Sequence, residues 1–253
     1  MPKMRKNKNK IGKKTLLLVT LSLVMLFLLP LQASAASVGV NVNGKSMNTL
    51  EIIEMFTILA LIPSILIMTT CFTRIVIVLS FLRNALGLQQ TPPNQVLISI
   101  ALFLSLFIMT PVVNEVNTQA YQPYKEQKIT QEQFLHKAAV PMKTFMLKNT
   151  KKEDLNLFVN LSKAKPVKSV NELSITVVIP AFMTSELKRA FLIGFLIFIP
   201  FLIIDMIVSS TLMSMGMIML PPSMISLPFK LLLFVLVDGW GLLFKTLAAS
   251  FNV

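Results

Sequence analysis

Apolar and polar positions divide the chain into three blocks. Long apolar runs cover residues 50–113 and 190–253, and a more polar block, residues 114–189, separates them. Each apolar block contains one short stretch of turn residues, so each predicts two helices joined as a hairpin. The predicted fold is therefore all-α and membrane-associated, with two long helical hairpins flanking a helical, water-exposed insert.

The first hairpin is predicted to turn between Gly87 and Pro92-Pro93. The glycine is typical of a helix C-terminus, and the prolines favour a turn before the next helix. The first arm, from Leu50 to Ala85, would be about 54 Å long at about 1.5 Å per residue, and Pro63 favours a kink in it. A bilayer core is only about 30 Å thick, so this arm must protrude or lie within a protein assembly.

The polar block predicts short amphipathic helices. Thr130 with Gln133, and Thr150 with Glu153, match the capping-box pattern of a helix start, and a narrow apolar stripe follows each of them. The stretch "SKAKPVKSVN" predicts a loop. The lysines of this block are most simply a solvated face of the insert.

The second hairpin is predicted to begin at Thr184-Ser185-Glu186, a helix-start signal that precedes a long apolar run. The methionine-rich stretch "MSMGMIML" and the following "PPSMISLP" predict the turn. The stretch "FKLLLFVLVDGWGLLFKTLAASF" predicts the returning arm.

The first 35 residues have the layout of a secretory signal peptide. A basic segment, an apolar run from Leu16 to Leu29 and small residues up to Ala35 follow one another, so cleavage is expected between Ala35 and Ala36. An uncleaved anchor is the alternative, but the apolar run is shorter than the roughly 20 residues of a membrane span. A short segment, residues 36–49, would then open the mature chain.

Composition supports a membrane protein and weakens a role in nucleic-acid binding. The chain is 54% hydrophobic and 14% charged, and a charged fraction of about 25% is usual in soluble domains. Removing residues 1–35, which hold seven basic and no acidic residues, would lower the formal net charge from +13 to +6. Most of the basicity therefore belongs to the export signal, and no basic-aromatic cluster supports nucleic-acid binding.

Residues that could carry chemistry are few. The single cysteine, Cys71, cannot form an intrachain disulfide, and the single histidine, His136, has no neighbouring ligand candidates at metal spacing. The sequence contains no G-x-S-x-G, Gly-rich phosphate loop or H-E-x-x-H. We therefore expect no enzyme activity, no cofactor and no metal site.

Four charged residues interrupt the apolar runs: Arg74, Asp205, Lys230 and Asp238. A charge at the centre of a bilayer costs at least about 2.5–3.5 kcal/mol, so such residues usually face protein or water. Lys230 and Asp238 lie about 12 Å apart along a helix, which favours pairing with other elements. We expect Arg74, Asp205 and Lys230 to be buried against protein, as ion pairs or beside an aqueous path; snorkelling from the ends of spans is the alternative.

Methionine occupies positions 213, 215, 217 and 219, just before Pro221-Pro222. Alternate residues point the same way in an extended segment but scatter over two faces in a helix. Methionine is unbranched and polarizable, which suits surfaces that must repack. The stretch predicts either a loop with one soft apolar edge or an ordinary apolar helix end.

Several long stretches resemble the FliP family of flagellar and type III secretion export-gate proteins. They run in order from about Leu50 to Phe251: "FTRIVIVLSFLRNALG", "TPPNQV", "AYQPYKE", "IPAFMTSELKRAF", "GFLIFIPFLIIDMIVSS" and "GMIMLPPSMISLPFKLLLFVLVDGW". Motifs of this length are highly specific, and the resemblance covers nearly the whole mature chain.

The resemblance implies a structural, pore-forming subunit of the flagellar export gate, in the bacterial inner membrane at the flagellar basal body. Several copies would assemble with FliQ and FliR and other export-apparatus proteins, and unfolded flagellar substrates would pass through the centre. The family's methionine-rich loop is thought to seal the pore as a gasket. Met217, Ile218 and Met219 match it here, and we assign Met215 to the same gasket.

Two alternatives remain open at the level of sequence. An injectisome gate subunit would share the family, and a small-solute or ion transporter would also carry charges within apolar runs. If the signal is removed, the mature N-terminus starts outside the membrane, and the order of spans then makes residues 114–189 extracytoplasmic.

Overall fold

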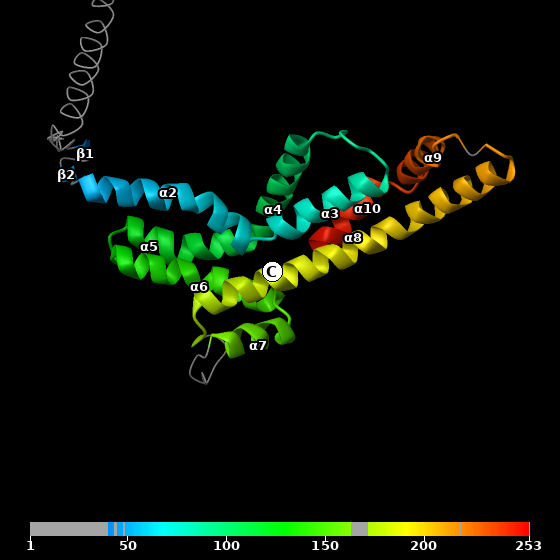
Figure 1. Ribbon diagram of the computed structural model, residues 1–253. Coiled ribbons are helices and arrows are strands. Elements are labelled where there is room, and N and C mark those ends of the chain that lie inside the picture. Colours follow the sequence, from blue (N-terminus) through cyan, green and yellow to red (C-terminus); the bar gives the residue numbers. More distant parts are fainter. Residues whose placement is uncertain (1–39, 43–44, 48, 163–171, 218, 253) are drawn as a thin grey trace, which may run out of the picture. The chain divides into compact units, whose positions relative to one another are not determined.

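The computed structural model describes residues 40–42, 45–47, 49–162, 172–217 and 219–252 (Figure 1). The predicted signal peptide, with Ala35 and Ala36, lies outside these residues. The chain divides into two units, residues 1–58 and 59–253.

In the first unit, β1 (Val40–Val42) and β2 (Lys45–Met47) form an antiparallel ribbon with Val40 opposite Met47. The sequence pattern did not predict this ribbon.

Two helices, not one, occupy the predicted first arm. α2 (Thr49–Thr69) and α3 (Phe72–Ala85) are separate, so a single arm of about 54 Å is wrong. The hydroxyl groups of Thr70 and Thr73 donate to backbone carbonyls in the last turn of α2, at 2.8 and 2.9 Å. These side chains compete with the helical hydrogen bonds and end α2, whereas Pro63 lies inside the helix.

The predicted end of α3 at Gly87 is confirmed. Gly87 has a φ of +78°, its N–H donates to the carbonyl of Asn84, and the N–H of Leu88 donates to the carbonyl of Arg83. This pair of bonds is the Schellman motif, which needs a left-handed residue and therefore favours glycine.

α4 (Asn94–Val116) continues without a break through the π-helical turn η1 (Asn117–Tyr121) into α5 (Gln122–Lys125). The helix therefore passes through the boundary that sequence analysis placed at residues 113 and 114. The boundaries of the five predicted segments stay predictions.

Two helices follow in the polar block, α6 (Gln131–Asn149) and α7 (Lys152–Leu161). The predicted capping box of Thr130 and Gln133 is confirmed at the start of α6. The one predicted at Thr150 is wrong, because its hydroxyl donates back to the carbonyl of Met146 in α6 at 2.7 Å.

α8 (Ile175–Ser214) begins earlier than predicted. Ser174 caps it by accepting a hydrogen bond from the N–H of Thr176, so a start at Thr184-Ser185-Glu186 is wrong. The hydroxyl of Thr184 instead donates to the carbonyl of Pro180, one turn earlier in the same helix. With 40 residues, α8 is about 60 Å long, twice the thickness of a bilayer core.

The returning arm is also broken. α9 (Pro222–Leu236) and α10 (Gly239–Ala249) meet at a bend of 63°. Asp238 lies in the bend with a φ of +49°, a left-handed conformation that interrupts a right-handed helix.

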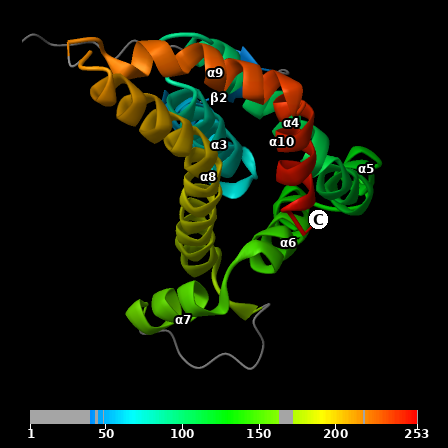
Figure 2. The ribbon, with the colours of Figure 1, turned by 90° about the vertical axis from the view of Figure 1, so that its right-hand side faces the viewer.

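Within the second unit, α8 is the helix on which α3, α6, α7 and α9 pack (Figure 2). Gly194 of α8 lets α3 approach closely, because a Cβ atom built there would lie 2.5 Å from the ring of Phe81. The same ring packs edge-to-face on Phe191, with 5.3 Å between ring centroids.

Within the described residues, three helices are long and apolar enough to cross a membrane, or four if α9 and α10 count as one bent span. Large apolar side chains on α2, α4, α8 and α9 are exposed in the single chain, and in water such a surface would be strongly unfavourable. Apart from the short β1–β2 ribbon the described elements are helices, which confirms the predicted all-α fold class, and the long apolar helices are compatible with membrane association.

Candidate functional site

The turn between α8 and α9, residues 215–221, is called the Met-rich turn here. α8 ends before it in a second Schellman motif. Gly216 has a φ of +75°, its N–H donates to the carbonyl of Met213, and the N–H of Met217 donates to that of Leu212, both at 3.0 Å. On the other side, Pro221 caps α9 and Pro222 is its first residue, a position where proline costs no hydrogen bond.

The described methionines of this turn differ in how far the rest of the chain covers them. Met215 is 67% exposed and Met219 is 98% exposed, while Met217 is 37% exposed. Ile218 lies outside the described residues. The structure divides the stretch between the two alternatives left open by the sequence: Met213 belongs to the last turn of α8, and Met215, Met217 and Met219 follow the helix.

Three polar side chains of α8 and α9, the helices that flank the Met-rich turn, meet in what we call the Asp205 cluster. Asp205 of α8 accepts a hydrogen bond from the hydroxyl of Ser226 at 2.6 Å and one from the ammonium group of Lys230 at 2.6 Å, one on each carboxylate oxygen. Lys230 also donates to the carbonyl of Ala85, at the end of α3, at 3.2 Å. The cluster therefore joins α3, α8 and α9.

Burial strengthens the hydrogen bonds and the ion pair within the Asp205 cluster. Ser226 and Lys230 are buried, and only a third of the Asp205 side chain is exposed. A charge removed from water is stabilised only by a nearby partner and by hydrogen bonds, and such interactions are stronger in a low dielectric. Sequence analysis singled out Asp205 and Lys230 but did not identify Ser226.

Arg74 lies at the centre of a second buried group, the Arg74 cluster. Its guanidinium donates two hydrogen bonds to the carboxylate of Glu186 in α8, one of them at 2.8 Å, and both side chains are fully buried. A third nitrogen donates to the carbonyl and the hydroxyl of Ser250, at 2.9 and 2.8 Å. The guanidinium also lies 3.7 Å from the centre of the Phe251 ring, a cation–π contact.

The Arg74 cluster holds the C-terminal end of the described chain together with Asn149 of α6. The Asn149 side chain donates to the carbonyl of Asn252 at 2.9 Å and accepts from its N–H at 3.1 Å. These paired hydrogen bonds satisfy the backbone N–H and carbonyl of Asn252, which lies outside any helix or strand.

A third group attaches α7 to α8. Asp154 of α7 is almost fully buried, accepts from the hydroxyl of Ser185 at 2.6 Å, and forms an ion pair with Lys188. Burial alone would raise the pKa of Asp154, but the hydrogen bonds from Lys188 and Ser185 outweigh it and the pKa lies below its usual value. This contribution to stability is fully present above the pKa of the unfolded chain, and it is lost as the pH falls through the folded one.

Asp238 differs from the other predicted charges. It is exposed in the single chain, and no ion pair reaches it among the described residues. Asp238 lies in the bend between α9 and α10 and is not buried within this chain, so a role for it as a buried charge in an assembly stays a prediction.

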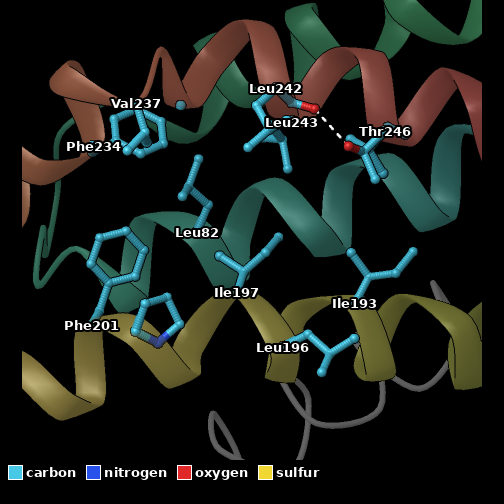
Figure 3. A pocket seen from close by; sticks show the side chains of 13 residues that line it. Leu82, Ile193, Leu196, Ile197, Phe201, Phe234, Val237, Leu242, Leu243 and Thr246 are labelled. Carbon is cyan, nitrogen blue, oxygen red and sulfur yellow. Dashed lines mark hydrogen bonds between the residues drawn. The ribbon is translucent and has the colours of Figure 1, made fainter.

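An apolar pocket lies between α3, α8 and the α9–α10 bend (Figure 3). Its volume is about 340 Å³, and residues such as Leu82, Ile197 and Phe234 line it. The hydroxyl of Thr246 donates to the carbonyl of Leu242 at 2.7 Å. No lining side chain titrates, so the pocket offers no acid–base chemistry.

The remaining candidates lie apart. Cys71 is buried with its sulfur 3.2 Å from the hydroxyl of Ser105, and His136 is exposed on α6. Within the part of the chain that the structure describes, no group of three or more His, Cys, Asp or Glu side chains could hold a metal ion.

Sequence reasoning missed the partners of the charges that it found. Glu186 and Arg74 are 112 positions apart, and Asp154 and Lys188 are 34 positions apart, so no local spacing connects them. The one available signal for Glu186 was a carboxylate close to a long apolar run, and it was interpreted as a helix start.

Known proteins are similar in sequence to this chain over most of its length. A sequence profile of the FliP family matches residues 55–247, which contain the Met-rich turn and the Asp205 cluster. A protein described as "Flagellar biosynthetic protein FliP" from Bacillus subtilis (strain 168) is 55% identical over 204 residues, 81% of this chain and 92% of that protein. Proteins of the same description from Aquifex aeolicus (strain VF5) and Pectobacterium carotovorum subsp. carotovorum are similar. The first is 50% identical over 83% of this chain and 88% of its own length, and the second is 51% identical over 83% and 82%.

Proposed function

This chain belongs to the FliP family, and on that premise we propose that it is a structural, pore-forming subunit of the flagellar protein-export gate. In this proposal several copies form a ring in the bacterial inner membrane, and unfolded flagellar proteins pass through its centre. The relatives described above are named as flagellar proteins, which favours a flagellar role over an injectisome role.

The exposed Met-rich turn is the observation that carries the proposal. It joins two apolar helices, yet Met215 and Met219 are 67% and 98% exposed in their own chain. An apolar tip that is exposed at the end of a helical hairpin needs a partner, and copies of the same tip in a ring would cover one another.

The chemistry of methionine fits a seal that must open. A pore wide enough for an unfolded chain must exclude ions when it is closed, which requires a dry, narrow ring of apolar groups. Methionine side chains are apolar and flexible, so they can close such a ring and still repack around substrates of varied sequence. We assign this gasket to Met215, Met217, Ile218 and Met219.

The exposed apolar helices support assembly with other subunits. α8 is about twice as long as a bilayer core is thick, so lipid alone cannot cover it without a large tilt. We propose that other copies of the chain, FliQ and FliR cover the rest. These contacts, and not an enzymatic reaction, would be the role of the protein.

We also propose the orientation that follows from an export signal in residues 1–35. Cleavage between Ala35 and Ala36 would leave the mature N-terminus outside the cytoplasm. The polar insert, residues 114–189, would then be extracytoplasmic, and both hairpin turns would lie on the opposite side.

The gasket can be tested by replacing Met217, Ile218 and Met219 together with alanine. We expect the complex to assemble and the membrane to leak small ions, because the smaller side chains no longer close the ring. Ion flux into inverted vesicles, or growth inhibition on expression of the variant, measures the leak.

A control of similar size removes exposed apolar side chains from one face of α4, as Ile98→Ala, Leu102→Ala and Leu106→Ala. It should not leak. If the triple variant of the Met-rich turn assembles and the membrane stays tight, these residues are ordinary packing and the proposed pore is wrong.

A further inference from the structure

We infer that the Asp205 cluster is a clamp that positions the Met-rich turn. The inference rests on the proposed gate function. The clamp consists of Asp205 on α8 and of Ser226 and Lys230 on α9.

The geometry of the clamp locks α9 against α8 in one register. Ser226 and Lys230 are four residues apart, one turn of α9, and each binds a different oxygen of the same carboxylate at 2.6 Å. A slide of α9 by one residue would move both donors by about 1.5 Å along the axis and break both bonds. Contacts between apolar side chains alone would resist such a slide less, because they lack direction.

The clamp is also attached to a third helix. The ammonium group of Lys230 reaches the carbonyl of Ala85 in the last turn of α3, where the helix ends in the Schellman motif at Gly87. A carbonyl at a helix C-terminus has no helical partner and carries partial negative charge, which suits a cation. The base of the α8–α9 hairpin is therefore held by α3 as well.

Apolar packing between α8 and α9 is incomplete beside the clamp. An apolar cavity of about 470 Å³ begins at the level of the clamp, lined by residues of α8 and by Ile225 and Phe229 of α9. A closely packed interface would resist movement by itself. Because packing leaves this space open, the directed hydrogen bonds of the clamp are what hold α9 in register on α8.

This arrangement makes Asp205, Ser226 and Lys230 positioning residues for the gasket. They do not touch the substrate path in the proposal. Their role is to hold the methionines in one closed position, because they fix the register of α9 on α8.

Ser226→Ala tests the clamp without leaving a charge unpaired. Ser223→Ala is the matched control, because Ser223 lies one turn earlier on α9 and is exposed. The first readout is hydrogen–deuterium exchange of the Met-rich turn in the assembled complex. Loss of one buried hydrogen bond of about 1 kcal/mol predicts exchange about fivefold faster in Ser226→Ala and unchanged in Ser223→Ala.

The second readout is ion leak, compared with the triple alanine variant of the Met-rich turn. We expect Ser226→Ala to leak at least about threefold more than the unmodified complex, as a gasket that is positioned less firmly closes less often. Asp205→Asn, which weakens the bond to Lys230 as well, should leak more than Ser226→Ala.

The outcomes separate the clamp from the gate. Unchanged exchange in both Ser226→Ala and Asp205→Asn overturns the clamp, whatever the leak. Faster exchange with a tight membrane, while the triple variant leaks, means that the clamp orders the turn but does not position the seal, and it also overturns the inference. If the triple variant itself is tight, the gate proposal fails, and the exchange data still decide whether the clamp exists.

Discussion

At the scale of single residues, Arg74 shows how this chain accommodates a charge among apolar helices. Its guanidinium has five donors and no acceptor, and the structure surrounds it with a carboxylate, a carbonyl, a hydroxyl and an aromatic ring. Because Glu186 is equally buried, neither member of the pair can lose the other without leaving an uncompensated charge.

This reciprocity predicts an asymmetry between single and double substitutions. Glu186→Gln or Arg74→Met should lower the free energy of unfolding of the solubilised protein by about 3–5 kcal/mol, because each leaves a buried charge unpaired. The double variant, Arg74→Met with Glu186→Met, should lose less than the worse single variant. Denaturant unfolding, with the assembled fraction as a second measurement, checks this.

The exposed pair Glu126 and Lys128 provides the control. Both side chains are more than half exposed. Glu126→Gln should therefore change stability by no more than about 0.5 kcal/mol. A double variant at Arg74 and Glu186 that is as unstable as both single variants combined would argue that the two residues act independently.

At the scale of helices, the ends of the two hairpin arms follow one rule. α3 ends at Gly87 and α8 at Gly216, both with a positive φ and the same pair of hydrogen bonds. The two glycines therefore end the helices that lead into the two turns, and the second one directs the chain into the Met-rich turn.

Gly216→Ala should be destabilising for a conformational reason alone. A Cβ atom at Gly216 would meet nothing within 4 Å, so the cost is that of a left-handed alanine, about 1–2 kcal/mol. Gly216→Asn should cost less, because asparagine tolerates this conformation. Hydrogen exchange in the last turn of α8 measures the effect.

Gly194→Ala offers a contrast within the same helix. Its Cβ would approach the ring of Phe81 to 2.5 Å, so the substitution should loosen α3 from α8 and leave the Met-rich turn intact.

Equal stability of Gly216→Ala and Gly216→Asn would show that backbone conformation does not set the cost of substitution at Gly216.

At the scale of the whole molecule, the exposed surface of the apolar helices is the main feature. Side chains such as Phe103 and Phe107 of α4 and Phe195 of α8 are more than half exposed in the single chain. In the proposed gate, lipid and neighbouring subunits cover them, and the polar insert lies on one side of the membrane.

The proposed orientation predicts which positions a membrane-impermeant maleimide reaches. In a Cys71→Ser background, Lys137→Cys on α6 should be labelled in cells whose outer membrane is permeabilised and whose inner membrane is intact. Thr91→Cys, in the turn between α3 and α4, should be labelled only after the inner membrane is permeabilised. Both native side chains are exposed, so burial does not explain a difference. The reversed pattern would contradict an extracytoplasmic insert.

The sequence by itself determined the features that depend on local pattern. The period and length of the apolar runs predicted membrane-associated helices, Thr130 with Gln133 predicted the start of α6, and Gly87 predicted the end of α3. The long motifs between Leu50 and Phe251 identified the family. Each of these predictions uses only residues that are close together in the sequence, so it does not depend on how the helices pack.

Only the tertiary structure decided which groups meet. Arg74 with Glu186, and Asp205 with Ser226 and Lys230, are joined by helix packing across 112, 21 and 25 positions, which no local spacing encodes. The break between α2 and α3 and the bend at Asp238 were missed for a related reason. A continuous apolar run predicts one helix, and only hydrogen bonds and packing formed on folding determine where such a helix must end.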